Sequence, residues 1–258
     1  MMSTAAFPDS ATLACQNRKC AAHRTSVFSY RYARHALLSL SFLSLTLRAE
    51  APITLPSEDV IAGIDNAQGT REQKLTGYSV SEHYTVRNSH FAQSAELTAA
   101  VVYQKGQGKT YKILSHKGPG FLQERVINRI LNEDALLSRP AERPHTFLTS
   151  ANYSMHVQGT QLLQGTLCYI VAIHPRMHHF SLIEGTAWVD VKDFWPLRIE
   201  GTPAASPSFW TGRPRIKREY TVVDGFSFPQ HSRATSKAFF GGKSELDIEY
   251  SQYAVLKQ

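Results

Sequence analysis

The sequence LCYIVAI at residues 167–173 indicates the fold, because this run of apolar and β-branched residues stops sharply at His174-Pro175. A second run, GTAWVDV at residues 185–191, turns through Lys192-Asp193 into FWPLRIEG at residues 194–201. Short runs of this composition, separated by turn residues, are typical of antiparallel strands joined by hairpins. We therefore expect an antiparallel sheet in this part of the chain.

The pattern continues on both sides of this region. Downstream, residues 215–223 turn at Asp224-Gly225 into a further strand, and upstream Tyr78, Val80, Tyr84 and Val86 alternate along one face of another. The predicted strands are residues 78–86, 96–104, 110–115, 146–158, 161–173, 185–191, 194–201, 215–223, 226–229 and 246–253.

Two segments have the features of helices. Ser57-Glu58-Asp59 is a helix-start signal, and the helix is expected to run to about Leu75. Residues 121–138 carry apolar side chains at three- and four-residue spacing and end before Pro140. The order of helix, strands, helix and many strands predicts an α+β fold with helices packed on one face of the sheet.

The first 51 residues resemble a targeting sequence. Arg31 and Arg34 precede an apolar stretch at residues 36–47, and Ala49-Glu50-Ala51 forms a small-x-small cleavage site. A buried core helix is the alternative for this stretch, which is too short for a membrane span of about 20 apolar residues. We expect residues 1–51 to be an N-terminal extension plus signal peptide, and residues 52–258 to be a single exported, periplasmic domain.

Charge and cysteine content fit an exported domain. The chain has 28 Lys/Arg and 21 Asp/Glu, of which six and two lie in residues 1–51, so the net charge falls from +7 to +3 without that segment. No clustered basic footprint remains, which argues against nucleic acid as a partner. Cys168 is then the lone cysteine and is expected to be a buried, unreactive thiol rather than a nucleophile.

Motifs for catalysis or cofactor binding are absent. The segment GQGKT at residues 106–110 lacks the first glycine of a phosphate-binding loop and is interpreted as a hairpin turn. The run HPRMHH at residues 174–179 has metal-like spacing, but a polar turn explains it as well. We expect no enzyme activity, no cofactor and no metal, with a secreted metal-dependent hydrolase using residues 174–179 as the least favoured alternative.

Aromatic residues crowd into the C-terminal half. Phe209 and Trp210 lie in the Pro- and Ser-rich loop at residues 202–214, and loops lie on protein surfaces. Exposed aromatic side chains on a loop are typical of a lid, a lipid contact or an anchor for another protein. Trp188 is explained at least as well by a place in the core.

Taken together, these residues resemble bacterial outer-membrane lipoprotein-sorting-like proteins of the LolA/LolB/RseB superfamily. The resemblance covers residues 57–253 and rests on strand and turn positions. They are Asn152-Tyr153, Gly165, Cys168-Tyr169, Pro175, Gly185, Trp188-Val189-Asp190, Arg198-Ile199-Glu200-Gly201, Ser206 to Trp210, Phe228-Pro229 and Ile248-Glu249-Tyr250. It implies a strongly curved antiparallel sheet, a half-open β-barrel, whose apolar cavity is covered by helices.

The resemblance also implies a function. By this likeness the protein is a periplasmic carrier that buries acyl chains of a lipid or lipoprotein, with envelope membrane proteins as further partners. Phe209 and Trp210 are expected to form a mobile rim, and Tyr153, Tyr169, Trp188 and Tyr220 to line the wall. An RseB-like sensor of envelope stress, working as a protein-interaction module, is the alternative.

Overall fold

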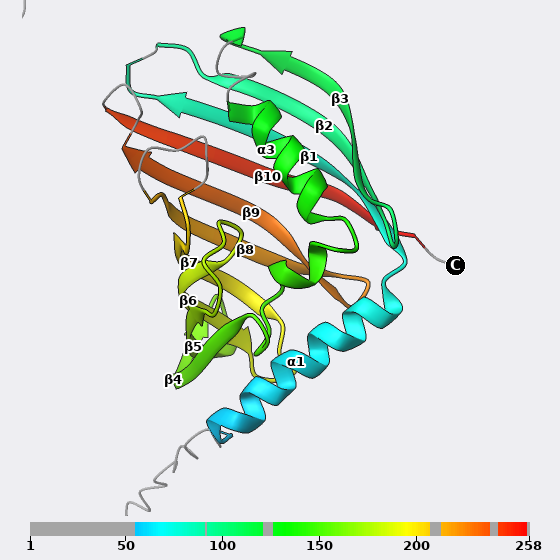
Figure 1. The fold of residues 1–258 in the computed structure, drawn as a ribbon, viewed down its shortest axis with the longest axis vertical. Helices are drawn as coiled ribbons and strands as arrows, with labels where there is room; N and C mark the ends of the chain where they lie inside the picture. Colours follow the sequence, from blue (N-terminus) through cyan, green and yellow to red (C-terminus); the bar gives the residue numbers. More distant parts are fainter. Residues whose placement is uncertain (1–54, 91, 121–125, 207–212, 238–241, 257–258) are drawn as a thin grey trace, which may run out of the picture. The chain divides into compact units, whose positions relative to one another are not determined.

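A computed structural model describes residues 55–90, 92–120, 126–206, 213–237 and 242–256. Ten strands form one antiparallel sheet in the order β3-β2-β1-β10-β9-β8-β7-β6-β5-β4 (Figure 1). In chain order the elements are α1 (Ser57–Lys74), β1 (Gly77–Asn88), β2 (Ala95–Gln104), β3 (Gly108–Lys117), α3 (Asn128–Leu137), the 3₁₀ helix η2 (Arg143–Thr146), β4 (Tyr153–Leu163), β5 (Thr166–Pro175), β6 (Ile183–Asp190), β7 (Pro196–Pro203), β8 (Arg215–Val223), β9 (Phe226–Lys237) and β10 (Lys243–Val255).

The sheet is open, because β3 and β4 form its two edges. Helices α1 and α3 lie on the same side of the curved sheet, which we call its inner face (Figure 1). The predicted α+β fold, a curved antiparallel sheet covered by helices, is confirmed.

Helix α1 follows the start and stop signals of its sequence. Glu58 and Asp59 lie in its first turn and Arg71 and Lys74 in its last, an arrangement that complements the helix dipole. Its amino-terminal half buries Val60 and Ile64. The helix ends where Leu75 adopts an extended conformation, which leads into β1.

Helix α3 lies within the helix that the sequence predicted at residues 121–138. It begins at Asn128, and residues 121–125 of the predicted helix lie outside the described residues. Ile127 and Leu131 of the predicted apolar stripe are buried against the sheet. These two residues of the stripe therefore pack as expected, with the apolar face of the helix turned toward the sheet.

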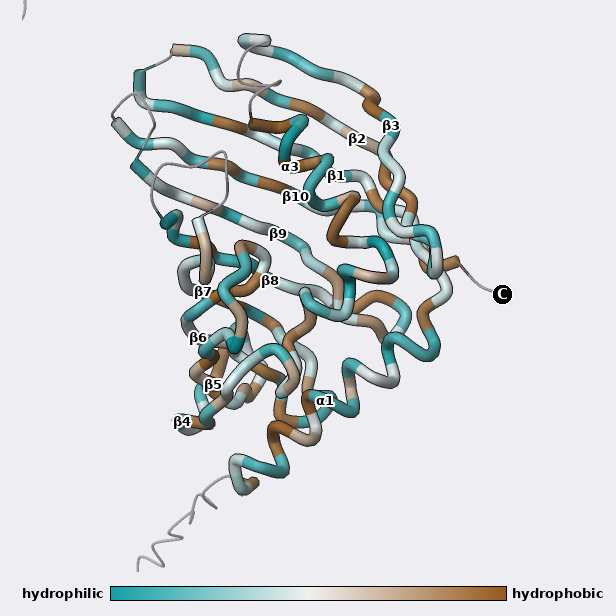
Figure 2. The backbone as a smooth tube through the Cα atoms, in the orientation of Figure 1, coloured by the Kyte–Doolittle hydropathy of each residue, from teal (hydrophilic) through white to brown (hydrophobic). Residues whose placement is uncertain are grey.

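Two clusters of apolar side chains form the core on the inner face. The first surrounds β1, β2 and α3 and contains Tyr84 and Phe228, and the second surrounds β4 to β7 and contains Val171 and Val189. Ile216 of β8 packs against both clusters. Hydrophobic residues recur along the strands at intervals, as a sheet with one buried face requires (Figure 2).

One predicted hairpin has its turn at the wrong position. The sequence suggested strands at residues 146–158 and 161–173, but β4 runs through Gly159, and the turn to β5 lies at Gln164-Gly165, both with positive φ. Gly159 (φ +149°) instead marks a bulge in the pairing with β5. A glycine inside a strand and a glycine in a turn look alike in sequence, and the bulge caused the error.

No helix in the described ranges combines the length and the apolar character needed to cross a membrane.

Candidate functional site: a cavity with buried charges

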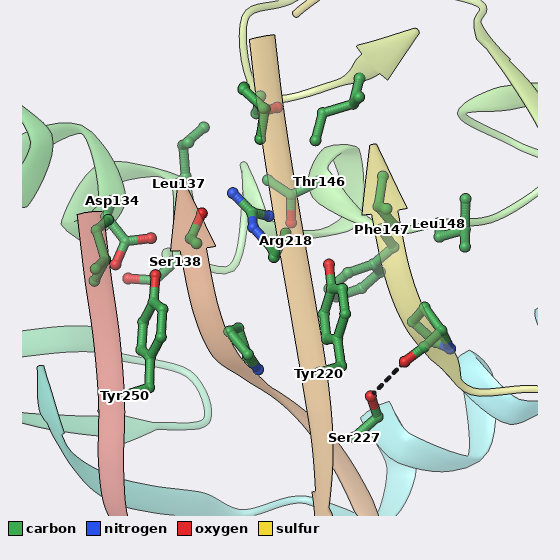
Figure 3. A pocket seen from close by; sticks show the side chains of 18 of the residues that line it. Asp134, Leu137, Ser138, Thr146, Phe147, Leu148, Arg218, Tyr220, Ser227 and Tyr250 are labelled. Carbon is green, nitrogen blue, oxygen red and sulfur yellow. Dashed lines mark hydrogen bonds between the residues drawn. The ribbon is translucent and has the colours of Figure 1, made fainter. Parts of the chain in front are cut away.

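A cavity of about 350 Å³ lies against the inner face of the sheet. Side chains of β7, β8, β9 and β10 form its floor, and α3 and the segment of residues 143–148 lie over it (Figure 3). Residues of both core clusters line it, so the cavity occupies the space between them. Its volume is at the lower end of the range of small-molecule sites, about 300–1,000 Å³.

Much of the wall is apolar. Ile199 on β7 and Ile216 on β8 point inward because strand alternation places them on the inner face. The apolar lining consists of Ile130, Leu137, Phe147, Leu148, Phe180, Ile183, Trp195, Pro196, Ile199, Pro214, Ile216, Pro229, Ala234, Leu246 and Ile248. Such a wall favours a hydrocarbon chain over a polar substrate.

A group of buried charges lies at one end of the cavity. Nζ of Lys109 is 2.6 Å from Oδ2 of Asp134 and 3.6 Å from Oε1 of Glu82. The hydroxyl of Tyr111 donates to Asp134, and that of Tyr84 donates to Glu82. Glu82 is 1 % exposed, so its carboxyl group interacts with these side chains instead of with water.

The two carboxyl groups differ in their ionisation. Burial raises the pKa of Glu82, although Lys109 opposes this shift. Burial would also raise the pKa of Asp134, but the charge of Lys109 and its hydrogen bond hold that pKa below its usual value. The pKa of Lys109 is well above its usual value, because Asp134 outweighs the effect of burial. Lys109 and Asp134 are therefore an ion pair, and Glu82 is the carboxyl group nearer to neutrality.

Arg218 lies in the cavity floor on β8. Burial would lower the pKa of its guanidinium group, but interactions with Tyr220, Tyr250 and Asp134 raise it. Its Nε is buried and has no hydrogen-bond partner among the described residues. Figure 3 shows the side chain pointing into the cavity, between Tyr220 and Tyr250.

Two more arginines close the end of the cavity near α1. Arg143 donates to both carboxylate oxygens of Glu72, at 3.0 and 2.8 Å, and Arg71 lies 3.2 Å from the same group. The guanidinium of Arg143 also stacks 4.3 Å over the ring of Tyr103, and that of Arg71 lies 5.3 Å from the ring of Phe228. The carboxylate of Glu72 thus forms ion pairs with both arginines.

The predicted wall residues have different positions. Tyr153 and Tyr220 line the cavity, and the hydroxyl of Tyr153 accepts a hydrogen bond from the backbone of Ile183 at 3.1 Å. Burial raises the pKa of Tyr153 to about 12. Tyr169 is buried in the second core cluster, with its ring stacked on that of Phe194.

Trp188 points away from the cavity. It lies on the outer face of β6, where its indole N–H donates to Gln161 at 3.0 Å and the guanidinium of Arg198 lies 5.7 Å from its ring. Phe209 and Trp210, the predicted rim, lie outside the described residues.

Cys168 and the histidine run have ordinary surroundings. The thiol of Cys168 is buried, which raises its pKa, and it lies 3.5 Å from the carbonyl oxygen of Thr166. His174 lies 3.6 Å from Glu184, whereas Nδ1 of His179 is 2.7 Å from Ser181. In the part of the chain that the structure describes, no three His, Cys, Asp or Glu residues are placed to hold a metal ion.

The buried charges escaped the sequence analysis, although a signal was present. Glu82 stands between Val80 and Tyr84 in the alternation of β1, and Arg218 stands between Ile216 and Tyr220 in β8. Both charged residues therefore occupy positions that point to the core. A charged residue at an inward position of a predicted strand is rare enough to mark a site.

No protein-family model and no curated protein matches the chain. Among solved structures, it is similar to one described as an outer membrane lipoprotein-sorting protein domain from Vibrio parahaemolyticus (TM-score 0.46, 9 % identity, 78 % of this chain and 94 % of that one). It is also similar to a LolA superfamily protein from Nitrosomonas europaea (TM-score 0.40, 12 % identity, 80 % of this chain and 96 % of that one). A third similar structure is the MucA/MucB complex of Pseudomonas aeruginosa (TM-score 0.27, 8 % identity, 78 % of this chain and 100 % of that one). Each of these structures is at most 12 % identical to the chain and has a TM-score below 0.5, so the resemblance to the LolA/LolB/RseB superfamily stays a prediction from the sequence.

Proposed function

We propose that this protein is a binding protein that reversibly buries an acyl chain of a lipid or lipoprotein in the cavity on its inner face. The observation that carries the proposal is the cavity itself, which lies between two otherwise well-packed core clusters. Binding, without covalent chemistry, is the proposed activity. The signal-like residues 31–51 support a periplasmic location for it.

The energetics favour this function. Each CH₂ group transferred from water to an apolar site contributes about 0.8 kcal/mol, so an acyl chain is held without any specific polar contact. Ile199, Ile216 and Ile248 provide apolar wall along three strands.

The first test is native mass spectrometry of the protein purified gently from an expressing cell. Adducts with lipid masses, released on denaturation and identified after extraction, would support the proposal and name the cargo class. A protein that stays free of adducts after incubation with lipids and acylated peptides would contradict it.

A variant that fills the cavity tests the site. Ala234→Phe places a large side chain in the lining, whereas Val222→Phe adds the same group at an exposed position of β8. Only the first is expected to lose lipid adducts, with a melting temperature close to that of the wild type. Leu137→Trp, on α3, is a second filling variant should Ala234→Phe fold poorly.

A role in binding another protein is the second candidate, and edge strand β3 favours it. Ile113 and Leu114 are 50 % and 56 % exposed, and a bulge interrupts the pairing of this edge strand opposite Thr98 and Ala99. An exposed apolar edge is a template for adding a strand from a partner. A lipid-free protein in the mass measurement, together with loss of function in cells on Leu114→Lys, would favour this candidate.

A further inference from the structure

Arg218 is a buried cation without a matching anion. An arginine stays charged at any physiological pH, and a buried charge requires a partner. Among the described residues no carboxylate forms an ion pair with it, and its Nε has no hydrogen-bond partner. Tyr220 and Tyr250, which interact with the guanidinium, are neutral phenols and do not balance its charge.

The surrounding carboxyl groups are already engaged. Asp134 is held by Lys109 at 2.6 Å and by Tyr111, and Glu82 is held by Lys109 and Tyr84. At the other end, Glu72 serves both Arg71 and Arg143. Glu133 also lines the cavity and has a partner of its own. Four cations line the cavity, and among the described residues Arg71, Lys109 and Arg143 each form an ion pair with a carboxylate, whereas Arg218 does not.

Hydroxyl donors lie beside this charge. Tyr220 on β8 and Tyr250 on β10 both line this part of the cavity, and a phenol hydroxyl can donate a hydrogen bond. In Figure 3 the hydroxyls of Tyr220 on β8 and Tyr250 on β10 point the same way, with β9 between the two strands, and the side chain of Arg218 is seen between them. A guanidinium with flanking phenols is a donor set suited to a carboxylate or phosphate.

Apolar wall begins immediately next to these donors. Ile216 precedes Arg218 by two residues on the same face of β8, and Ile199 lies on β7 beside it. The floor of the cavity therefore places apolar side chains directly beside the guanidinium of Arg218. The cavity volume of about 350 Å³ suits one small molecule rather than several chains.

We propose that the cavity takes a single-chain amphiphile with an anionic oxygen head group, a carboxylate or a phosphate, which pairs with the guanidinium of Arg218 while its chain lies against Ile199 and Ile216. This inference rests on the acyl-binding function proposed above and specifies the ligand class. The tyrosines 220 and 250 donate to the head group, and Lys109 remains paired with Asp134.

The test compares three probes with the same chain: dodecanoate, dodecyl phosphate and uncharged dodecanol. Calorimetric titrations of the full-length protein at pH 8 give a dissociation constant for each. The wild type is expected to bind an anionic probe at least about tenfold more tightly than dodecanol, since a hydrogen bond to a charged group contributes about 1.5–3 kcal/mol. The preferred anion distinguishes a carboxylate from a phosphate head group.

Three arginine variants locate the effect. Arg218→Met should remove the preference for the anion and leave dodecanol binding unchanged or stronger, and Arg218→Lys should keep part of it. Arg233→Met is the matched control, because Arg233 lies on the outer face of β9 and pairs with Asp247 at 2.9 Å. It should bind all three probes as the wild type does.

The outcomes separate this inference from the function on which it rests. Equal binding of dodecanoate, dodecyl phosphate and dodecanol by the wild type, or an unchanged preference in a folded Arg218→Met variant, would overturn the head-group assignment and leave acyl binding intact. Failure of every probe to bind the wild type would overturn both.

Discussion

Nζ of Lys109 lies 2.6 Å from Oδ2 of Asp134, and this ion pair joins edge strand β3 to helix α3 at one end of the cavity. Ser138, at the end of α3, adds a second link by accepting a hydrogen bond from the backbone of Lys109 at 2.7 Å. The helix over the cavity is therefore held by polar contacts as well as by Ile127 and Leu131.

A double-mutant cycle will measure this link. Lys109→Met and Asp134→Leu should each destabilise the protein, and the double variant should be more stable than the sum of the two losses predicts, because neither charge is then left unpaired. We expect a coupling energy between about 0.5 and 3 kcal/mol from urea unfolding. Additive losses would show that the pair does not contribute to stability.

The Glu82→Gln variant should become more stable than the wild type as the pH rises. Burial raises the pKa of Glu82, so the native state binds its proton more tightly than the unfolded state does, and the wild type loses stability as pH increases from the unfolded value of about 4.3 through the folded pKa. Glutamine keeps an acceptor for Tyr84 and carries no charge. Urea unfolding between pH 4 and pH 8 measures the difference, and a wild-type advantage that grows with pH would contradict this account.

Asp247→Asn should destabilise the protein near pH 7 by about 1–3 kcal/mol, because Asp247 accepts hydrogen bonds from His231 and Arg233 on the outer face. Burial would raise its pKa, but these two partners lower it. The stability from the carboxylate is thus present above the unfolded pKa of about 3.9 and is lost as pH falls through the lower folded value.

Measuring the free energy of unfolding of Asp247→Asn and wild type from pH 7 to pH 2 checks the sign of this effect. The difference should shrink in acid. Glu245→Gln is the control, since its contacts with Arg87, Arg233 and Lys243 are 3.6–3.8 Å long, and the expected loss is below about 1 kcal/mol. An equal loss in both variants would argue against a special role for Asp247.

Gly185→Ala and Gly69→Ala should have opposite effects on stability. Gly185 of β6 faces Gly201 of β7, and a Cβ at either position would overlap the carbonyl oxygen of the opposite strand. The expected loss for Gly185→Ala is about 1–3 kcal/mol. At Gly69 in α1 a Cβ would meet no atom within 4 Å, so alanine there should stabilise the helix by about 0.5–1 kcal/mol. The melting temperatures of the two variants and the wild type, measured under the same conditions, test both predictions.

The local sequence pattern was sufficient to predict the position of most of the strands. Asp224-Gly225 makes the β8–β9 turn with positive φ at both residues, as the dipeptide predicts, and Ser57 begins α1. Gly159 and Gly165 show where local pattern fails, because one lies in a bulge and the other in a turn. The choice between them depends on which register with β5 buries the apolar side chains.

The aromatic residues show a second limit. Trp188 and Tyr169 both look like wall residues in sequence, yet Trp188 stands on the outer face and Tyr169 is covered by Phe194. Alternation assigns two residues of one strand to the same face or to opposite faces, but it does not say which face is inner. That assignment requires the position of the helices.

The strands, helices and α+β class of this protein follow from periodicity and turn residues, because those are properties of neighbouring residues in the chain. The cavity and its charges do not, because Glu82, Lys109, Asp134 and Arg218 come from three strands and a helix. Their pairing is set by the strand order, which places β10 between β1 and β9, and by the packing of α3 on β3. The tertiary structure also decides which of these charges are paired within the protein and which, like that of Arg218, form no ion pair with a carboxylate of the described residues.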